Sequence, residues 1–134
     1  MGIFDIFKKK KANIDINCRF NFNKAPELLE SYKQYRTFKL KATSLSRKDV
    51  KSEVYEEAAK MRDDYGRNVL AKEIWDIFSP KTPTLYNADT EEYIDWEKLF
   101  NTNFDQLSEK QKDFLVGLIE GNYIYELPKK YYND

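Results

Sequence analysis

The chain of 134 residues contains no histidine, and Cys18 is its only cysteine. Histidine is the one side chain whose ordinary pKa lies in the physiological range, and it is the commonest ligand of catalytic zinc. The composition therefore excludes nucleophilic sites that pair serine or cysteine with histidine, and it excludes ordinary zinc sites. A lone cysteine also excludes an internal disulfide, which favours a cytoplasmic protein.

Glycine is scarce too, and the four glycines are too far apart to write a P-loop or a dinucleotide-binding fingerprint. The acidic residues of 89–97 lack the spacing of a calcium-binding loop, and carboxylates at the start of a helix commonly complement its dipole. We therefore predict no cofactor, no metal site and no catalytic residue. The chain is interpreted as non-enzymatic.

Long apolar runs are absent, since the longest, residues 114–119, is far too short to span a bilayer. Residues 1–12 combine apolar side chains with four successive lysines, a composition suited to an anionic membrane surface. The myristoylation pattern fails at Ile6, however, and the apolar part precedes the lysines, the reverse of a secretory leader. Both observations argue against membrane association. This start resembles that of many small bacterial cytosolic proteins, some of which are immunity proteins for toxins.

Aromatic residues make up 16% of the chain and hydrophobic residues 41%, enough packing material for a folded domain although 34% of the residues are charged. The length suits one domain. We predict an N-terminal segment over residues 1–12 and a single globular domain over residues 13–134. The abundance of Lys, Asn, Ile, Tyr and Phe resembles the composition of proteins from AT-rich bacterial or phage genomes.

Alternation of apolar and polar residues from Ile14 to Phe22 is the clearest strand signal, and it predicts a strand over residues 13–22. Residues 37–43 also alternate, but their apolar members fit a helical stripe as well. We favour a strand there and leave a helix open. A short third strand is predicted over residues 122–127.

Helical spacing dominates after residue 46. Ser46 with Asp49, and Ser108 with Gln111, have the spacing of capping boxes, and glycines follow both segments as expected helix ends. The predicted fold class is α+β, with a small two- to three-stranded sheet covered by four or five helices. The helices are predicted over residues 26–35, 46–66, 68–78, 90–100 and 108–121.

The formal net charge of zero conceals a gradient along the chain. Residues 1–51 hold 13 Lys and Arg against 5 Asp and Glu, whereas residues 89–134 hold 5 against 11. Such asymmetry is typical of a bipolar surface that prefers charged partners. It is equally consistent with two ends that fold against each other and cancel, and both interpretations stay open.

Protein binding is the leading functional hypothesis. Tryptophan and tyrosine are frequent anchors of interfaces, and an acidic surface steers a basic partner toward it. We predict a cytosolic, non-enzymatic binding factor, an inhibitor or immunity-type protein that occludes a toxin, nuclease or effector. The predicted partner-binding residues are Glu91, Glu92, Asp95, Trp96, Tyr131 and Tyr132.

A nucleic-acid-associated accessory protein is the alternative. The basic N-terminal third supplies cations for phosphates and aromatic rings for bases. It carries no recognisable nucleic-acid-binding motif, and a sequence pI of about 6.4 argues against a dedicated binder. In this alternative the predicted contacts are Lys39, Lys41, Arg47 and Lys48.

Overall fold

The computed structural model describes residues 18–121 and 124–133, and the fold is α+β, as predicted. The predicted segment 1–12, the first part of the predicted strand (residues 13–17) and residues 122–123 lie outside the described residues. The helices are α2 (Leu29–Ser46), α3 (Ser52–Tyr65), α4 (Ala71–Phe78), α5 (Trp96–Phe100) and α6 (Glu109–Glu120). The antiparallel strands are β1 (Thr84–Asn87), β2 (Glu92–Asp95) and β3 (Tyr125–Glu126), in the order β2-β1-β3.

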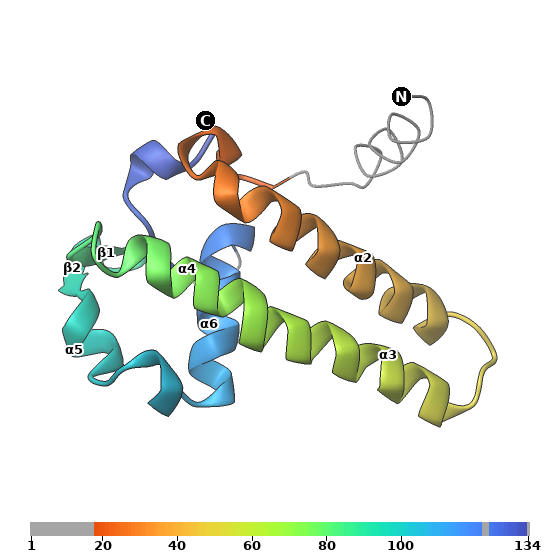
Figure 1. Ribbon diagram of the computed structural model, residues 1–134. Coiled ribbons are helices and arrows are strands. Elements are labelled where there is room, and N and C mark those ends of the chain that lie inside the picture. The colour runs from red at the N-terminus through yellow and green to blue at the C-terminus, as the bar shows by residue number, and fades with distance from the viewer. Residues whose placement is uncertain (1–17, 122–123, 134) are drawn as a thin grey trace.

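Helices α2 and α3 run antiparallel as a hairpin, and their connecting loop lies at the end of the molecule opposite the small sheet (Figure 1). Helix α3 continues through a π-helical turn, Gly66–Leu70, into α4, so these segments form one long rod (Figure 1). Helix α6 packs across the middle of this rod. Among the described residues, no helix is both long and apolar enough to cross a membrane.

Residues 37–43 are helical, which corrects the strand favoured from the sequence. They lie inside α2, where Ala42 is fully buried and the Phe38 ring packs against Tyr65 of α3, with ring centroids 5.5 Å apart. Packing against α3 therefore selects the helical stripe over the alternating pattern. The following helix begins at Ser52 rather than at Ser46, whose hydroxyl donates to the Thr43 carbonyl oxygen instead of capping.

Gly66 does not end a helix as the sequence suggested. Its φ of −59° is right-handed, and the Ala71 N–H donates to the Gly66 carbonyl oxygen, which continues the helix in π geometry. A Cβ atom at this position would lie 2.8 Å from Cε1 of Tyr35. The glycine therefore allows α2 to approach the rod closely.

Residues 92–95 form a strand, which corrects the helix predicted over residues 90–100. The Asn87 side chain accepts hydrogen bonds from the N–H groups of Asp89 and Thr90, and Glu91 adopts a φ of 59°. These contacts fold the chain back so that β2 pairs with β1, and helix α5 begins only at Trp96.

Local signals at the last helix are confirmed. Ser108 and Gln111 form a reciprocal capping box at the start of α6, and Gly121 follows its end with a φ of 74°. The predicted third strand is present as β3. Within residues 18–22, by contrast, the predicted strand is reduced to one antiparallel bridge, between Phe20 and Tyr132.

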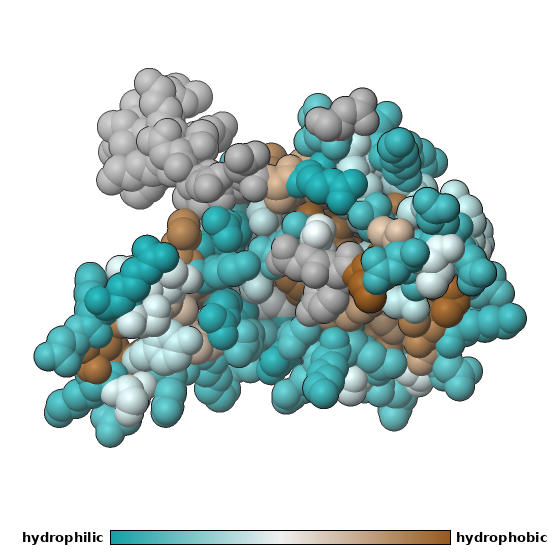
Figure 2. Space-filling model, turned by 180° about the vertical axis from the view of Figure 1, so that it is seen from behind, coloured by the Kyte–Doolittle hydropathy of each residue, from teal (hydrophilic) through white to brown (hydrophobic). Residues whose placement is uncertain are grey.

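One hydrophobic cluster joins the rod, α6 and the two described chain ends. Its largest fully buried side chains include Phe20, Phe78, Leu70 and Leu118. The surface seen from behind is mostly hydrophilic, with apolar areas over the end of the α2–α3 hairpin and over the opposite end (Figure 2). The sheet therefore packs on the core at one end of the molecule, and the loop between α2 and α3 lies at the other end.

Candidate functional site

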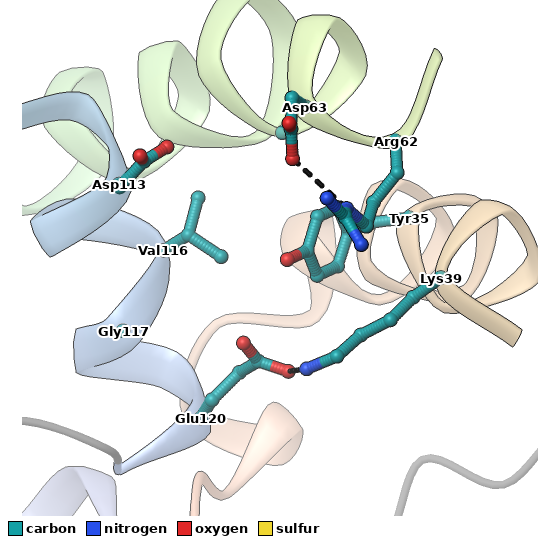
Figure 3. Close-up of a pocket in the computed structure, with 9 residues that line it drawn as sticks. Tyr35, Lys39, Arg62, Asp63, Asp113, Val116, Gly117 and Glu120 are labelled. Atoms are coloured by element: carbon teal, nitrogen blue, oxygen red, sulfur yellow. Dashed lines mark hydrogen bonds and ion pairs between the residues drawn. The ribbon is translucent and has the colours of Figure 1, made fainter. Parts of the chain in front are cut away.

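A polar pocket of about 250 Å³ lies where α2, α6 and the C-terminal end of α3 meet (Figure 3). Tyr35 projects into it from α2, and Arg62 and Asp63 enter from α3 (Figure 3). The complete lining is Tyr35, Lys39, Arg62, Asp63, Gly66, Asp113, Val116, Gly117 and Glu120.

The charges of this polar pocket are already paired. Nζ of Lys39 lies 2.9 Å from Oε2 of Glu120, and Nε of Arg62 lies 2.9 Å from Oδ1 of Asp63. Asp113 accepts two hydrogen bonds from the guanidinium of neighbouring Arg67, at 2.8 and 3.0 Å. Because each charge has its partner, the polar pocket joins three helices and offers no uncompensated charge to a ligand.

A second candidate is the outer face of the sheet. The pairing places Tyr86 opposite Tyr93 on one side and Glu126 on the other, and paired residues share a face. Asp95, paired with Thr84, falls on the same face by strand alternation. We call these five residues the outer sheet face.

Two tyrosine rings dominate the outer sheet face. The rings of Tyr86 and Tyr93 have centroids 5.2 Å apart, and Tyr93 is 70% exposed. Burial, then the negative charge of Glu91, raises the pKa of Tyr86, so its hydroxyl stays protonated at neutral pH. The outer sheet face thus presents an aromatic pair, and the Tyr86 hydroxyl of that pair can donate a hydrogen bond at neutral pH.

A pocket of about 390 Å³ opens on the outer sheet face. Arg19 borders it and forms an ion pair with Glu126, with 2.9 Å between Nη1 and Oε1. The pocket is lined by Arg19, Tyr86, Tyr93, Glu126, Leu127, Pro128 and Lys129.

A third cavity, which we call the tryptophan pocket, measures about 590 Å³ and lies between the end of α4 and α5. It contains the only two tryptophans of the chain, and their ring centroids are 5.6 Å apart. Its lining is Trp75, Asp76, Ser79, Pro80, Trp96, Glu97, Asn101, Thr102 and Asn103.

The predicted partner-binding residues separate into two groups. The acidic residues Glu91, Glu92 and Asp95 are exposed at the β1–β2 hairpin. The aromatic residues predicted as anchors are buried, with exposed fractions of 3% for Trp96, 7% for Tyr131 and 6% for Tyr132.

The three aromatic residues are held by core contacts, so the structure gives them a packing role, and their contact with a partner stays a prediction. The Tyr131 ring meets Phe78 edge to face, and Trp96 packs against Trp75. The Tyr132 hydroxyl accepts from the Leu127 N–H and donates to the Leu118 carbonyl oxygen, both at 2.9 Å. Of these three aromatic residues, only Trp96 lines one of the three cavities described above.

Sequence reasoning missed the paired tyrosines of the outer sheet face, half-buried Tyr86 and exposed Tyr93. Tyr93 was assigned to a helix, so its pairing with Tyr86 could not be seen. The polar run from Asn87 to Thr90 is a turn signal that would have predicted a hairpin and brought the two rings together.

The residues of the nucleic-acid alternative do not share one surface. Lys39 is held by Glu120 in the polar pocket, and Lys41, two positions along α2, points about 200° around the helix from it. Arg47 and Lys48 are exposed in the loop that ends the hairpin. Three of the four predicted cations are therefore accessible, in two places.

The described residues contain no group of three or more side chains that could hold a metal ion. Burial raises the pKa of the Cys18 thiol and of the nearby Tyr32 hydroxyl, so both stay protonated at neutral pH.

In comparisons with known proteins, no family model, no curated protein and no solved structure matches this chain.

Proposed function

We propose that this protein is a cytosolic, non-enzymatic binding factor that occludes a basic protein, such as a toxin, nuclease or effector, through its outer sheet face. The observation that carries the proposal is Tyr93, which is 70% exposed although its ring packs against that of Tyr86. An aromatic side chain that is already ordered loses little conformational freedom on binding, and tyrosine is enriched among residues that dominate interface affinity.

Charge indicates the chemistry of the partner. Residues 88–97, which include the β1–β2 turn and β2, contain five carboxylates and no lysine or arginine. Exposed charges of one sign around a central contact accelerate encounter with a partner of the opposite sign. A basic protein surface is therefore the complement of this end of the molecule.

The scaffold also supports an occluding role. Leu85 and Ile94, which alternate with the outer tyrosines, face inward, and Leu85 is fully buried. Tyr125 of β3 packs against Phe114 of α6, with ring centroids 5.6 Å apart. The outer sheet face is thus fixed to the core from behind, as a surface that binds without rearrangement requires.

The proposal is tested by photo-crosslinking in the cells that produce the protein. A benzophenone amino acid replaces Tyr93 in one variant and exposed Val54, on α3, in the matched control. We expect an adduct with a basic protein from position 93 and not from position 54. Adducts of equal yield from both positions, or from position 54 alone, would contradict the proposal.

The purified partner then gives a quantitative test. Tyr93→Ala should weaken binding by about 2 kcal/mol or more, roughly thirtyfold in Kd, because it removes the central ring. Tyr93→Phe keeps the ring and should bind nearly as well as the parent. Unchanged affinity of Tyr93→Ala, measured by calorimetry, would place the interface elsewhere.

A further inference from the structure

The tryptophan pocket adjoins the acidic end of the molecule, because Trp96 directly follows Asp95 of the outer sheet face. We propose that this pocket binds the cationic side chain of an arginine residue. The inference rests on the proposed function, since it assigns that arginine to the basic partner and gives the partner a second anchoring point.

The aromatic rings provide the first argument. Indole is the ring that attracts cations most strongly, and arginine also stacks on aromatic faces. Cations already gather at this aromatic cluster, since Nζ of Lys72 and Nζ of Lys112 lie 5.3 and 5.0 Å from the ring centroid of Phe104. Within residues 18–121 and 124–133, no cation is found over Trp75 or Trp96. The two indole rings, which attract cations most strongly, are therefore among the rings of this cluster over which no cation of the described residues lies.

Charge provides the second argument. Asp76 and Glu97 both line the tryptophan pocket, and none of the described residues that line it is basic. Asp76 is partly neutralised by Lys72, with 2.9 Å between Nζ and Oδ1. Glu97 is exposed and takes part in none of the ion pairs found between described residues. Its carboxylate is therefore the natural counterion of a bound guanidinium.

An unpaired donor provides the third argument. Trp96 is 3% exposed, and its indole N–H has no hydrogen-bond acceptor among the described residues. A buried donor without an acceptor costs free energy. An arginine residue within a peptide chain brings both missing groups, a cation for the rings and a main-chain carbonyl oxygen as acceptor.

The presence of only two tryptophans makes the test specific, because both indole N–H signals in a ¹⁵N-correlated spectrum report on this pocket. The probe is N-acetyl-arginine amide, titrated into the full chain, and the matched control is N-acetyl-citrulline amide, which has nearly the same shape without the charge. We expect saturable shifts of the indole signals with the arginine probe, with a Kd of roughly millimolar strength. The citrulline probe should give none.

Charge variants identify the counterion. Glu97→Gln should weaken binding of the arginine probe about fivefold, whereas Glu53→Gln on exposed α3 should leave it unchanged. Equal responses to both probes, no saturable shift, or unchanged affinity in Glu97→Gln would overturn the inference. These outcomes are separate from a failure of the proposed function, which is measured on the partner protein with Tyr93→Ala.

Discussion

Phe20 lies opposite Tyr132 in an antiparallel bridge, and their rings meet edge to face with centroids 6.3 Å apart. This contact joins the two described ends of the chain, and main-chain hydrogen bonds on both sides extend it. The Asn21 N–H donates to the Tyr131 carbonyl oxygen at 2.8 Å, and the Asn133 N–H donates to the Arg19 carbonyl oxygen at 2.6 Å.

The same closure affects the charge gradient. Arg19 with Glu126 and Lys39 with Glu120 each pair the basic third with the acidic third. Part of the gradient is therefore cancelled where the two ends meet. The exposed acidic residues of the β1–β2 hairpin remain at one end of the rod, and the basic loop after α2 remains at the other (Figure 1).

Truncation of Phe20 should show how much the closure contributes to stability. Its side chain is 1% exposed and contacts the rings of Phe22 and Phe78 as well as Tyr132. Phe20→Ala should lower the free energy of unfolding by about 3–5 kcal/mol, because it removes buried area and leaves a cavity. Urea denaturation measures this loss.

The matched control for this change is Lys24→Ala, since Lys24 is exposed in the same segment. It should alter the free energy of unfolding by less than about 0.5 kcal/mol. Similar, small losses in both variants would show that the bridge between Phe20 and Tyr132 does not stabilise the fold.

The Tyr132 hydroxyl should make stability depend on alkaline pH. Burial, then the charge of Glu126, raises the pKa of Tyr132 from 10.0 to about 12. The unfolded chain therefore loses this proton at lower pH than the folded protein does. The corresponding stability is complete below pH 10 and should decrease as the pH rises from 10 to 12.

Tyr132→Phe separates the hydroxyl from the ring. At neutral pH the variant should be less stable by about 1–3 kcal/mol, because the Leu127 N–H and the Leu118 carbonyl oxygen lose their partner. Above pH 10 its stability should decline less steeply than that of the parent. Urea denaturation at several pH values measures both effects, and parallel declines would contradict the role given to this hydroxyl.

Substitution of Gly66 should test the close approach of α2 to the rod. Alanine has the higher helix propensity, by about 1 kcal/mol. Its Cβ would nevertheless lie 2.8 Å from Cε1 and 3.2 Å from Cδ1 of Tyr35. Overpacking of this kind costs about 1–3 kcal/mol, so Gly66→Ala should be neutral to destabilising in thermal denaturation.

The second arm of this experiment removes the obstructing ring. In a Tyr35→Ala background, Gly66→Ala should become stabilising, because the propensity gain is no longer opposed by the contact. If Gly66→Ala has the same effect in both backgrounds, the glycine is not required by the Tyr35 contact.

Local signals predicted those parts of the fold that local chemistry determines. Ser108 and Gln111 cap the start of α6 through each other, and Gly121 adopts the positive φ that follows its end, so their pattern was sufficient. Residues 37–43 fit two periodicities, and the choice depends on the contact of Phe38 with Tyr65 of a different helix. A single sequence does not contain that contact as a pattern.

Only part of the candidate site was visible in the sequence, because the rest depends on contacts between residues that are distant along the chain. The acidic residues around Asp95 were identified from charge alone, and the structure leaves them exposed. Tyr131 and Tyr132 were predicted to contact a partner, but Phe20 and Phe78 cover them from distant parts of the chain. Tyr93 gained its exposed position only through strand pairing.

The last prediction distinguishes the acidic residues from the tyrosine once a partner is purified. Exposed charges at the edge of an interface act mainly on the association rate, whereas a central anchor acts on the dissociation rate. Glu91→Lys, Glu92→Lys and Asp95→Lys combined should slow association and flatten its dependence on salt. Tyr93→Ala should mainly accelerate dissociation.

A control with the same change in net charge makes this measurement specific to position. The control replaces three glutamates that are exposed on α3, away from the sheet: Glu53, Glu56 and Glu57. When all three are replaced by lysine, association with the partner should be much faster than it is for the triple variant of the β1–β2 hairpin. Surface plasmon resonance at several salt concentrations gives both rates. Equal slowing by the two triple variants would mean that the partner responds to net charge alone, and the outer sheet face would then have no special part in the encounter.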